Sequence, residues 1–144
     1  MRNLMDWDYC KKNFIKELEI DKEKIKSIIE TVDMRLEFIE SVKVNDRNVS
    51  FIVEGYYEVI KELLVALLLS NGLRSKNHQC LISYFYKNYS EYEVDINLIS
   101  QMSFLRNRLD YYGESIEIEF YEKNKKEFDK IIKILKRLIK EKNK

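Results

Sequence analysis

The chain contains no proline and only three glycines in 144 residues. These two residue types interrupt helices and shape most turns, so their scarcity favours long, unbroken helices. Charged residues make up 35% of the chain and hydrophobic residues 45%, a balance that gives each helix one face for a core and one for water. The sequence therefore predicts an all-α fold.

Hydrophobic spacing divides the sequence into a short N-terminal helix and four to five main helices. Short connections between them favour antiparallel neighbours, so we expect an up-and-down bundle. A chain of this length can bury one core, and we expect residues 1–144 to form a single domain. The expected helices are Trp7–Leu18, one that follows Asp21 and runs past Ile39, Phe51–Leu69, His78–Tyr89, Asp95–Tyr112 and Tyr121–Lys142.

The third of these helices is apolar on almost every side, which is typical of a helix at the centre of a bundle. Ser115–Phe120 alternates apolar and acidic residues and is expected to be briefly extended. Two stripes with helical spacing are expected to face the core: Leu98, Met102, Leu105, Leu109 and Tyr112, and then Phe128, Ile131, Ile132, Leu135, Leu138 and Ile139. The expected helix caps are Asp21, Ser50 and either Ser75 or Asn77 at the starts, and Gly72 and Gly113 at the ends.

Cysteine and histidine are too sparse for a zinc site of the usual kind, because the chain has two cysteines and a single histidine, His78. Cys10 and Cys80 lack the spacing of a metal-binding or redox motif. A disulfide between them is one possibility, and buried free thiols are the expectation for a cytoplasmic protein. Neither a metal nor a cofactor is expected.

No segment has the length and apolar character of a membrane span. The most apolar stretch, Val59–Leu69, includes Lys61 and Glu62 and is too short to cross a bilayer. The N-terminus carries acidic residues where a signal peptide needs an apolar run. We therefore expect a cytoplasmic protein without membrane contact.

Charge is distributed unevenly, although the net charge is only +1. Residues 121–144 hold ten Lys and Arg against four Asp and Glu, and the preceding 120 residues hold 16 against 21. A basic C-terminal helix on an acidic body could contact nucleic acid. The plainer explanation, which we favour, is that lysines near a helix C-terminus complement the helix dipole and keep the surface hydrated.

The polar residues of Arg106–Gly113 form the best candidate for a functional site. Arg106, Asn107 and Arg108 flank the apolar stripe of their helix and are followed by Tyr111. Guanidinium groups bind phosphate through two hydrogen bonds, and tyrosine rings can stack on bases, so this set suits a nucleotide or an RNA backbone. A structural alternative is that Arg106 pairs with Asp110 one helical turn later.

The segment Leu-Arg-Asn-Arg-Leu-Asp-Tyr-Tyr-Gly at residues 105–113 resembles the signature of HEPN domains, helical nucleotide-binding bundles. The resemblance extends back through residues 66–73 and 77–85 and forward into the lysine-rich last helix, covering most of residues 50–140. It implies a homodimer that binds nucleotide or RNA. It also implies a small nucleotidyltransferase as protein partner, within a toxin–antitoxin-like or regulatory module.

Many HEPN domains are metal-independent ribonucleases with a histidine four to six residues after the arginine. This chain carries Tyr111 there, and tyrosine, with an ordinary pKa near 10, is a poor base at pH 7. We expect Arg106 and Arg108 to hold phosphate, Asn107 to orient the backbone or the arginines, and Tyr111 to line the cleft. The alternatives are a ribonuclease that uses Arg106 with Tyr111 or the accessory His78, and a non-catalytic dimeric scaffold.

The resemblance also bears on the tyrosines, because the nucleotidyltransferase partner of some HEPN proteins modifies a tyrosine near the signature. Tyr112 belongs to the apolar stripe and is expected in the core, which makes Tyr111 the better candidate for such a modification. The other tyrosines are expected to pack in the core or at a dimer interface.

Overall fold

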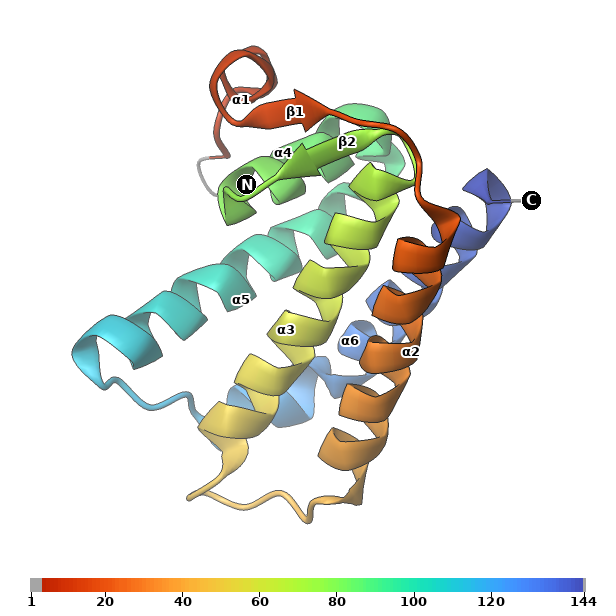
Figure 1. Ribbon diagram of the computed structural model, residues 1–144. Helices are drawn as coiled ribbons and strands as arrows, with labels where there is room; N and C mark the ends of the chain where they lie inside the picture. The colour runs from red at the N-terminus through yellow and green to blue at the C-terminus, as the bar shows by residue number, and fades with distance from the viewer. Residues whose placement is uncertain (1–3, 144) are drawn as a thin grey trace.

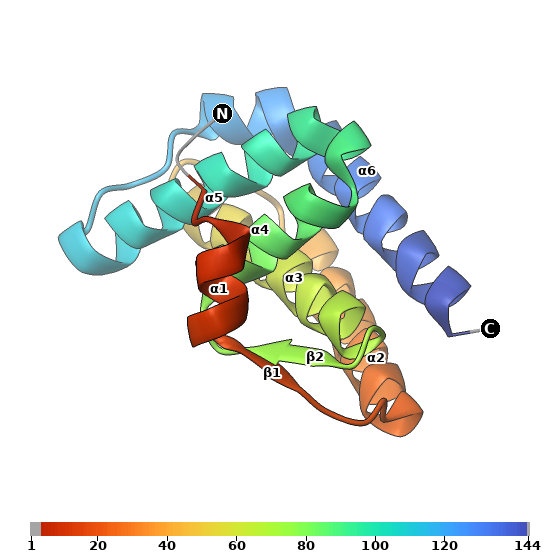
Figure 2. The ribbon, with the colours of Figure 1, turned by 90° about the horizontal axis from the view of Figure 1, so that it is seen from above.

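The long apolar helix predicted near residues 51–69 is the element around which the other helices are arranged. It is α3, Val49–Leu69, in a computed structural model that describes residues 4–143 (Figure 1). α3 contacts α2, α4, α5 and α6, and the view from above shows these helices around it (Figure 2). Within the described residues the elements are α1 (Trp7–Asn13), β1 (Ile15–Glu17), α2 (Lys22–Ser41), α3, β2 (Leu73–Ser75), α4 (His78–Asn88), the 3₁₀ turn η1 (Ser90–Tyr92), α5 (Glu93–Tyr112) and α6 (Ile118–Lys142).

The predicted all-α bundle is confirmed, and its core forms where α3 meets the inward faces of its neighbours. Almost the whole length of α3 is buried, including Leu63, Leu64 and Leu67. Fully burying one such side chain stabilises the fold by about 1.5–3 kcal/mol. All six residues of the predicted stripe on α6, from Phe128 to Ile139, are buried as well.

Several predicted helix caps are confirmed. The carboxylate of Asp21 accepts a hydrogen bond from Lys24 N at the start of α2, and Asn77 Oδ1 accepts one from Cys80 N at the start of α4. Gly113 caps α5 in the left-handed conformation, with φ of 66°. Gly72 is also left-handed, with φ of 72°, but it lies two residues beyond Ser70, the C-cap of α3.

Ser50 is not the cap that the sequence predicted, because α3 already begins at Val49. The buried Ser50 Oγ instead accepts a hydrogen bond of 2.8 Å from Ile116 N. That bond fastens the segment between α5 and α6 to the first turn of α3. The predicted extended stretch was Ser115–Phe120. Only residues 115–117 of it belong to this connecting segment, because α6 begins at Ile118.

The N-terminal arm differs most from the prediction. The first helix ends at Asn13, not at Leu18, and Ile15–Glu17 pairs with Leu73–Ser75 as a two-stranded antiparallel sheet. A sheet of two short strands is marginal alone, and here it is supported by a disulfide between Cys10 and Cys80. The expectation of free thiols is therefore wrong. The two sulfurs are joined because α1 packs directly on α4.

Among the helices of residues 4–143, none is both long enough and apolar enough to cross a membrane. Even α3 is interrupted by charged side chains on one side, among them Glu54, Glu58 and Lys61. These charges lie on a helix whose other sides are buried, and they mark the position of the candidate site.

Candidate functional site

The side of α5 that faces α3 changes from apolar to polar along the helix. Ile96, Ile99 and Ser103 are buried, and Arg106 and Asp110 continue the same face in steps of three and four. The predicted stripe lies beside this face, so of its five members only Met102 is fully buried. α5 approaches α3 through its N-terminal half and diverges from it towards Gly113 (Figure 1).

Tyr111 and Tyr112 both lie on this diverging end of α5. Their exposed fractions are 73% and 68%, so the expectation that Tyr112 packs in the core is wrong. The apolar stripe requires a partner helix along its full length, and no described helix covers the last turn of α5. Tyr111 is therefore an accessible hydroxyl on the outside of the molecule, and it takes no part in the described contacts that hold Arg106.

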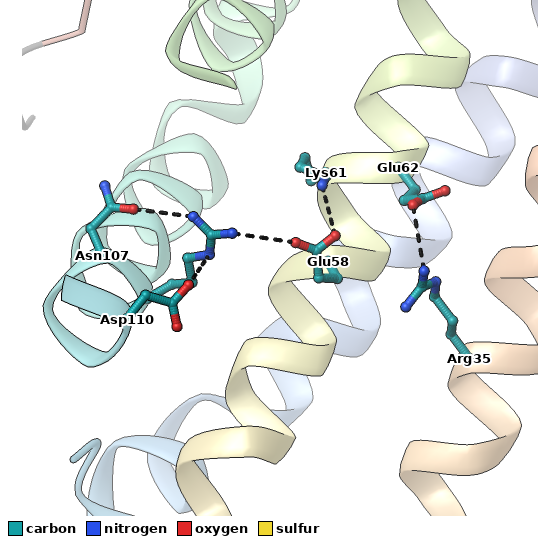
Figure 3. A network of polar contacts seen from close by, with 7 residues as sticks. Arg35, Glu58, Lys61, Glu62, Asn107 and Asp110 are labelled. Carbon is teal, nitrogen blue, oxygen red and sulfur yellow. Dashed lines mark hydrogen bonds and ion pairs between the residues drawn. The ribbon is translucent and has the colours of Figure 1, made fainter. Parts of the chain in front are cut away.

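Arg106 of α5 is held by carboxylates of two helices, Glu58 of α3 and Asp110 of α5, both labelled in Figure 3. Its Nε lies 3.1 Å from Asp110 Oδ2, and its Nη2 lies 3.9 Å from Glu58 Oε1. Nη1 donates a long hydrogen bond of 3.4 Å to Asn107 Oδ1. Nε is buried, and its contact with Asp110 is an ion pair whose geometry does not satisfy a hydrogen bond. The structural alternative for Arg106, pairing with Asp110, is thus confirmed.

The surroundings of Arg106 bring together titratable side chains from three helices. Lys61 Nζ lies 2.7 Å from Glu58 Oε2, and the side chain of Asp110 lies close enough to Glu54 to raise the pKa of that carboxyl. His78, the first residue of α4, lies close enough for the charges of Lys61 and Arg106 to act on it. We call this set the Arg106 cluster: Glu54, Glu58 and Lys61 of α3, His78 of α4, and Arg106, Asn107 and Asp110 of α5.

Two groups of the Arg106 cluster have pKa values shifted in opposite directions. Burial raises the pKa of Glu54, and the hydrogen bond and negative charge of Asp110 raise it further. Burial lowers the pKa of His78, and the nearby charges of Lys61 and Arg106 add to that effect. Near neutral pH the imidazole is therefore uncharged and able to accept a proton, and Glu54 holds its proton more tightly than an ordinary glutamate.

A second layer of hydrogen bonds supports the Arg106 cluster from the buried side. Gln79 Nε2, at the start of α4, donates to Ser103 Oγ at 3.0 Å. Ser103 also hydrogen-bonds Tyr57 of α3, whose pKa is raised by burial in spite of that bond. α3, α4 and α5 are thus joined by polar contacts directly behind the Arg106 cluster.

Arg108 does not join the cluster, although the sequence predicted that it acts beside Arg106. Its Nε donates a 2.8 Å hydrogen bond to Glu114 Oε2, and Nη2 contacts the other carboxylate oxygen. Its guanidinium carbon also lies 4.4 Å from the centre of the Tyr112 ring. Arg108 therefore closes the end of α5 around Gly113, and its hydrogen bonds lower the pKa of Glu114.

The cluster is polar, partly buried and still within reach of solvent. The side chains of Arg106, Glu58 and Asp110 keep exposed fractions of 23%, 22% and 35%. Sequence reasoning identified Arg106, Asn107 and His78 but missed the carboxylates of α3. Their signal was present, because residues 54, 58 and 61 follow helical spacing on an otherwise apolar helix.

The chain matches no family model, no curated protein and no solved structure. The resemblance to HEPN domains therefore depends on the residues quoted above.

Proposed function

We propose that the protein is a HEPN-like helical bundle that binds a nucleotide or RNA at the Arg106 cluster. The observation that carries this proposal is that Arg106, the arginine of the HEPN-like segment, stands in a partly buried polar seam shared by three helices. Guanidinium groups in such seams bind phosphate well, because partial burial strengthens charged hydrogen bonds.

In this proposal a phosphate group competes with the carboxylates that hold Arg106 in the free protein. Glu58 lies at 3.9 Å, beyond hydrogen-bond range, so its contact is the easier one to replace. Asn107 is next to the guanidinium and has an amide that can bind phosphate or a base edge. Lys61 and His78 supply further donors on the neighbouring helices.

The proposal includes a homodimer and a nucleotidyltransferase partner, working together in a toxin–antitoxin-like or regulatory module of the cytoplasm. The exposed Tyr111 and Tyr112, at the end of α5, support a protein interface beside the cluster. Tyr111 would be the accessible acceptor if the partner transfers a nucleotidyl group. The Cys10–Cys80 disulfide bears on the proposed cytoplasmic location, because the cytoplasm of most cells keeps thiols reduced. Intracellular proteins of hyperthermophiles are the exception.

A second candidate function, a metal-independent endoribonuclease, is favoured by the opposed pKa shifts of His78 and Glu54. Pairs of groups tuned in this way are typical of acid–base sites. His78 would take the proton of a ribose 2′-hydroxyl, whose oxygen attacks the adjacent phosphorus. The P–O5′ bond breaks, and Glu54, whose raised pKa favours its acid form, would give a proton to the leaving 5′-oxygen. Arg106 would stabilise the negative charge on the phosphorus oxygens.

Binding and cleavage are tested with Arg106→Gln and a matched control, Arg35→Gln. Arg35 pairs with Glu62 of α3 at 3.8 Å but lies outside the cluster (Figure 3). Calorimetry with ATP and fluorescence anisotropy with a labelled 12-nucleotide RNA should give at least tenfold weaker binding for Arg106→Gln and wild-type binding for Arg35→Gln. Equal binding by both variants would contradict the proposal.

The ribonuclease candidate needs a separate assay, in which RNA integrity is followed on a denaturing gel. Cleavage that disappears in His78→Gln and in Glu54→Gln, with RNA binding retained, would establish the enzyme. If purified wild-type protein and both variants leave the RNA equally intact, the protein binds without cleaving.

A further inference from the structure

A basic hollow lies over the two-stranded sheet and includes Asn77, the residue just before α4. Its volume is about 370 Å³, and it is lined by residues 12–16 and 74–77. Four of these residues are cationic, and none of the lining residues is acidic: the cations are Lys12, Lys16, Arg74 and Lys76.

The pairing of β1 with β2 puts two of these cations directly against each other. Lys16 is the register partner of Arg74 in the antiparallel ladder. Like charges opposite each other destabilise a strand pair, and bound anions relieve this cost. Glu17, the nearest acidic residue of β1, alternates to the other face of the strand.

None of the four cations forms an ion pair with another described residue, in contrast to the arginines of α5. Arg74 is half-buried, so its guanidinium is less hydrated than that of a fully exposed arginine. Four unpaired cations around one hollow produce a local positive potential on a chain whose net charge is only +1.

One aromatic ring lines the hollow, and a second ring, from α1, packs against it. Phe14 lines it with 39% of its surface exposed, and Tyr9, 54% exposed, packs edge-on against Phe14 with ring centres 5.9 Å apart. Exposed rings beside a row of cations are the two elements that bind single-stranded nucleic acid, since bases stack on the rings and the cations follow the phosphates.

The frame of the hollow is fixed by covalent and hydrogen bonds. The Cys10–Cys80 disulfide links α1 to α4. Leu18 N donates a 2.9 Å hydrogen bond to Gly72 O, just after the end of β1 and just before the start of β2. Ser75 Oγ accepts a 3.1 Å hydrogen bond from Asn77 N. The next residue along the chain, His78, already belongs to the Arg106 cluster.

We propose that this ribbon, residues 12–16 with 74–77, binds the phosphate backbone of a single-stranded RNA. Successive phosphates lie along Lys16, Arg74 and Lys76, and bases stack on Phe14 and Tyr9. The strand then passes the start of α4 towards the Arg106 cluster. This inference rests on the proposed function in taking RNA as the ligand, and it adds a binding surface on the two-stranded sheet.

The test compares two double variants with equal loss of charge. Lys16→Gln/Arg74→Gln neutralises the ribbon, and Lys43→Gln/Arg47→Gln neutralises two exposed cations in the loop between α2 and α3, at the other end of α3 (Figure 1). Circular dichroism and thermal unfolding are used to check that both variants fold. Anisotropy with the 12-nucleotide RNA is measured over a series of salt concentrations.

The ribbon variant should bind this RNA at least tenfold more weakly, and its salt slope should fall by about 1.4 for two lost phosphate contacts on a single strand. The loop variant should stay within twofold of wild type. Phe14→Leu should weaken binding roughly fivefold or more without changing the salt slope. Equal affinities for the two double variants would overturn the proposal.

Two further arms separate this inference from its rivals. The first uses vesicles with 30% phosphatidylserine. If they bind the wild type but not the ribbon variant, and if the wild type does not bind RNA, the ribbon is a lipid site and the proposal is overturned. ATP binding that is lost in Arg106→Gln but intact in the ribbon variant supports two distinct surfaces. If Arg106→Gln binds ATP and RNA as tightly as wild type while the ribbon variant no longer binds RNA, the proposed function of the Arg106 cluster fails. The ribbon site then stands.

Discussion

Arg106 Nη2 of α5 lies 3.9 Å from Glu58 Oε1 of α3, which makes this arginine the charged link between two helices that diverge beyond it. The same guanidinium is paired with Asp110 on its own helix. One cation therefore balances carboxylates on two elements, and the carboxylates would repel one another without it.

The first prediction concerns the stability that Arg106 contributes. Arg106→Ala removes the cation from among partly buried carboxylates and should lower the free energy of unfolding by about 1–2 kcal/mol, less than for a fully buried pair. Arg35→Ala, which breaks an exposed pair, should cost below about 0.5 kcal/mol. Urea unfolding measures both variants. Equal losses would mean that Arg106 is an ordinary surface arginine.

The second prediction concerns pH and His78, whose pKa is lowered by burial and by the charges of Lys61 and Arg106, with Glu58 opposing them. The unfolded chain takes up this proton more readily than the folded one. Stability should therefore fall as pH decreases through the ordinary histidine pKa of about 6.5. Urea unfolding at pH 7.5 and 5.5 should show a smaller fall for His78→Gln than for wild type. A fall of the same size in both proteins would exclude His78 as its source.

The third prediction concerns the disulfide between Cys10 and Cys80, which closes a loop with a sequence separation of 70. Replacing both cysteines with alanine should lower the free energy of unfolding by about 2–4 kcal/mol, because the unfolded chain regains the freedom of that loop. Adding a reductant should destabilise the wild type and leave the double variant unchanged. Wild-type protein that is insensitive to reductant, with two titratable thiols, would contradict the disulfide.

The fourth prediction compares two glycines with left-handed backbone conformation. A Cβ at Gly113 would meet no atom within 4 Å, so Gly113→Ala should cost only about 1 kcal/mol of backbone strain. A Cβ at Gly72 would lie 3.0 Å from Leu18 O, so Gly72→Ala should cost more and loosen the start of the sheet. Thermal unfolding ranks the two variants, and the reverse order would show that the contact with Leu18 O is unimportant.

Local spacing in the sequence was sufficient to predict the main helices and most of their ends. Asp21, Asn77 and Gly113 act at short range, through the first or last turn of their own helix. The sheet was not predictable in this way, because Ile15–Glu17 obtains its hydrogen bonds from β2, far along the chain. In Ile15–Glu17 only Ile15 is partly buried, so this segment has no local pattern that would predict the end of the preceding helix.

The candidate site was predicted in part for the same reason. Arg106, Asn107 and Asp110 share one helix, so their proximity follows from helical spacing. The nearness of Glu58 and His78 to Arg106 depends on how α3 and α4 pack against α5, which spacing within one helix does not specify. Tyr112 was wrongly placed in the core because the divergence of α5 from α3 is also a property of packing.

The central claim, that a nucleotide or RNA binds at the Arg106 cluster, is tested most directly by an NMR titration of ¹⁵N-labelled protein with AMP and with the 12-nucleotide RNA. The account predicts saturable shifts that are largest for the side-chain signals of Arg106 Nε–H and Asn107 and for the backbone amide of His78, and that are lost in Arg106→Gln. Shifts that avoid these three residues, or that persist unchanged in Arg106→Gln, would contradict it.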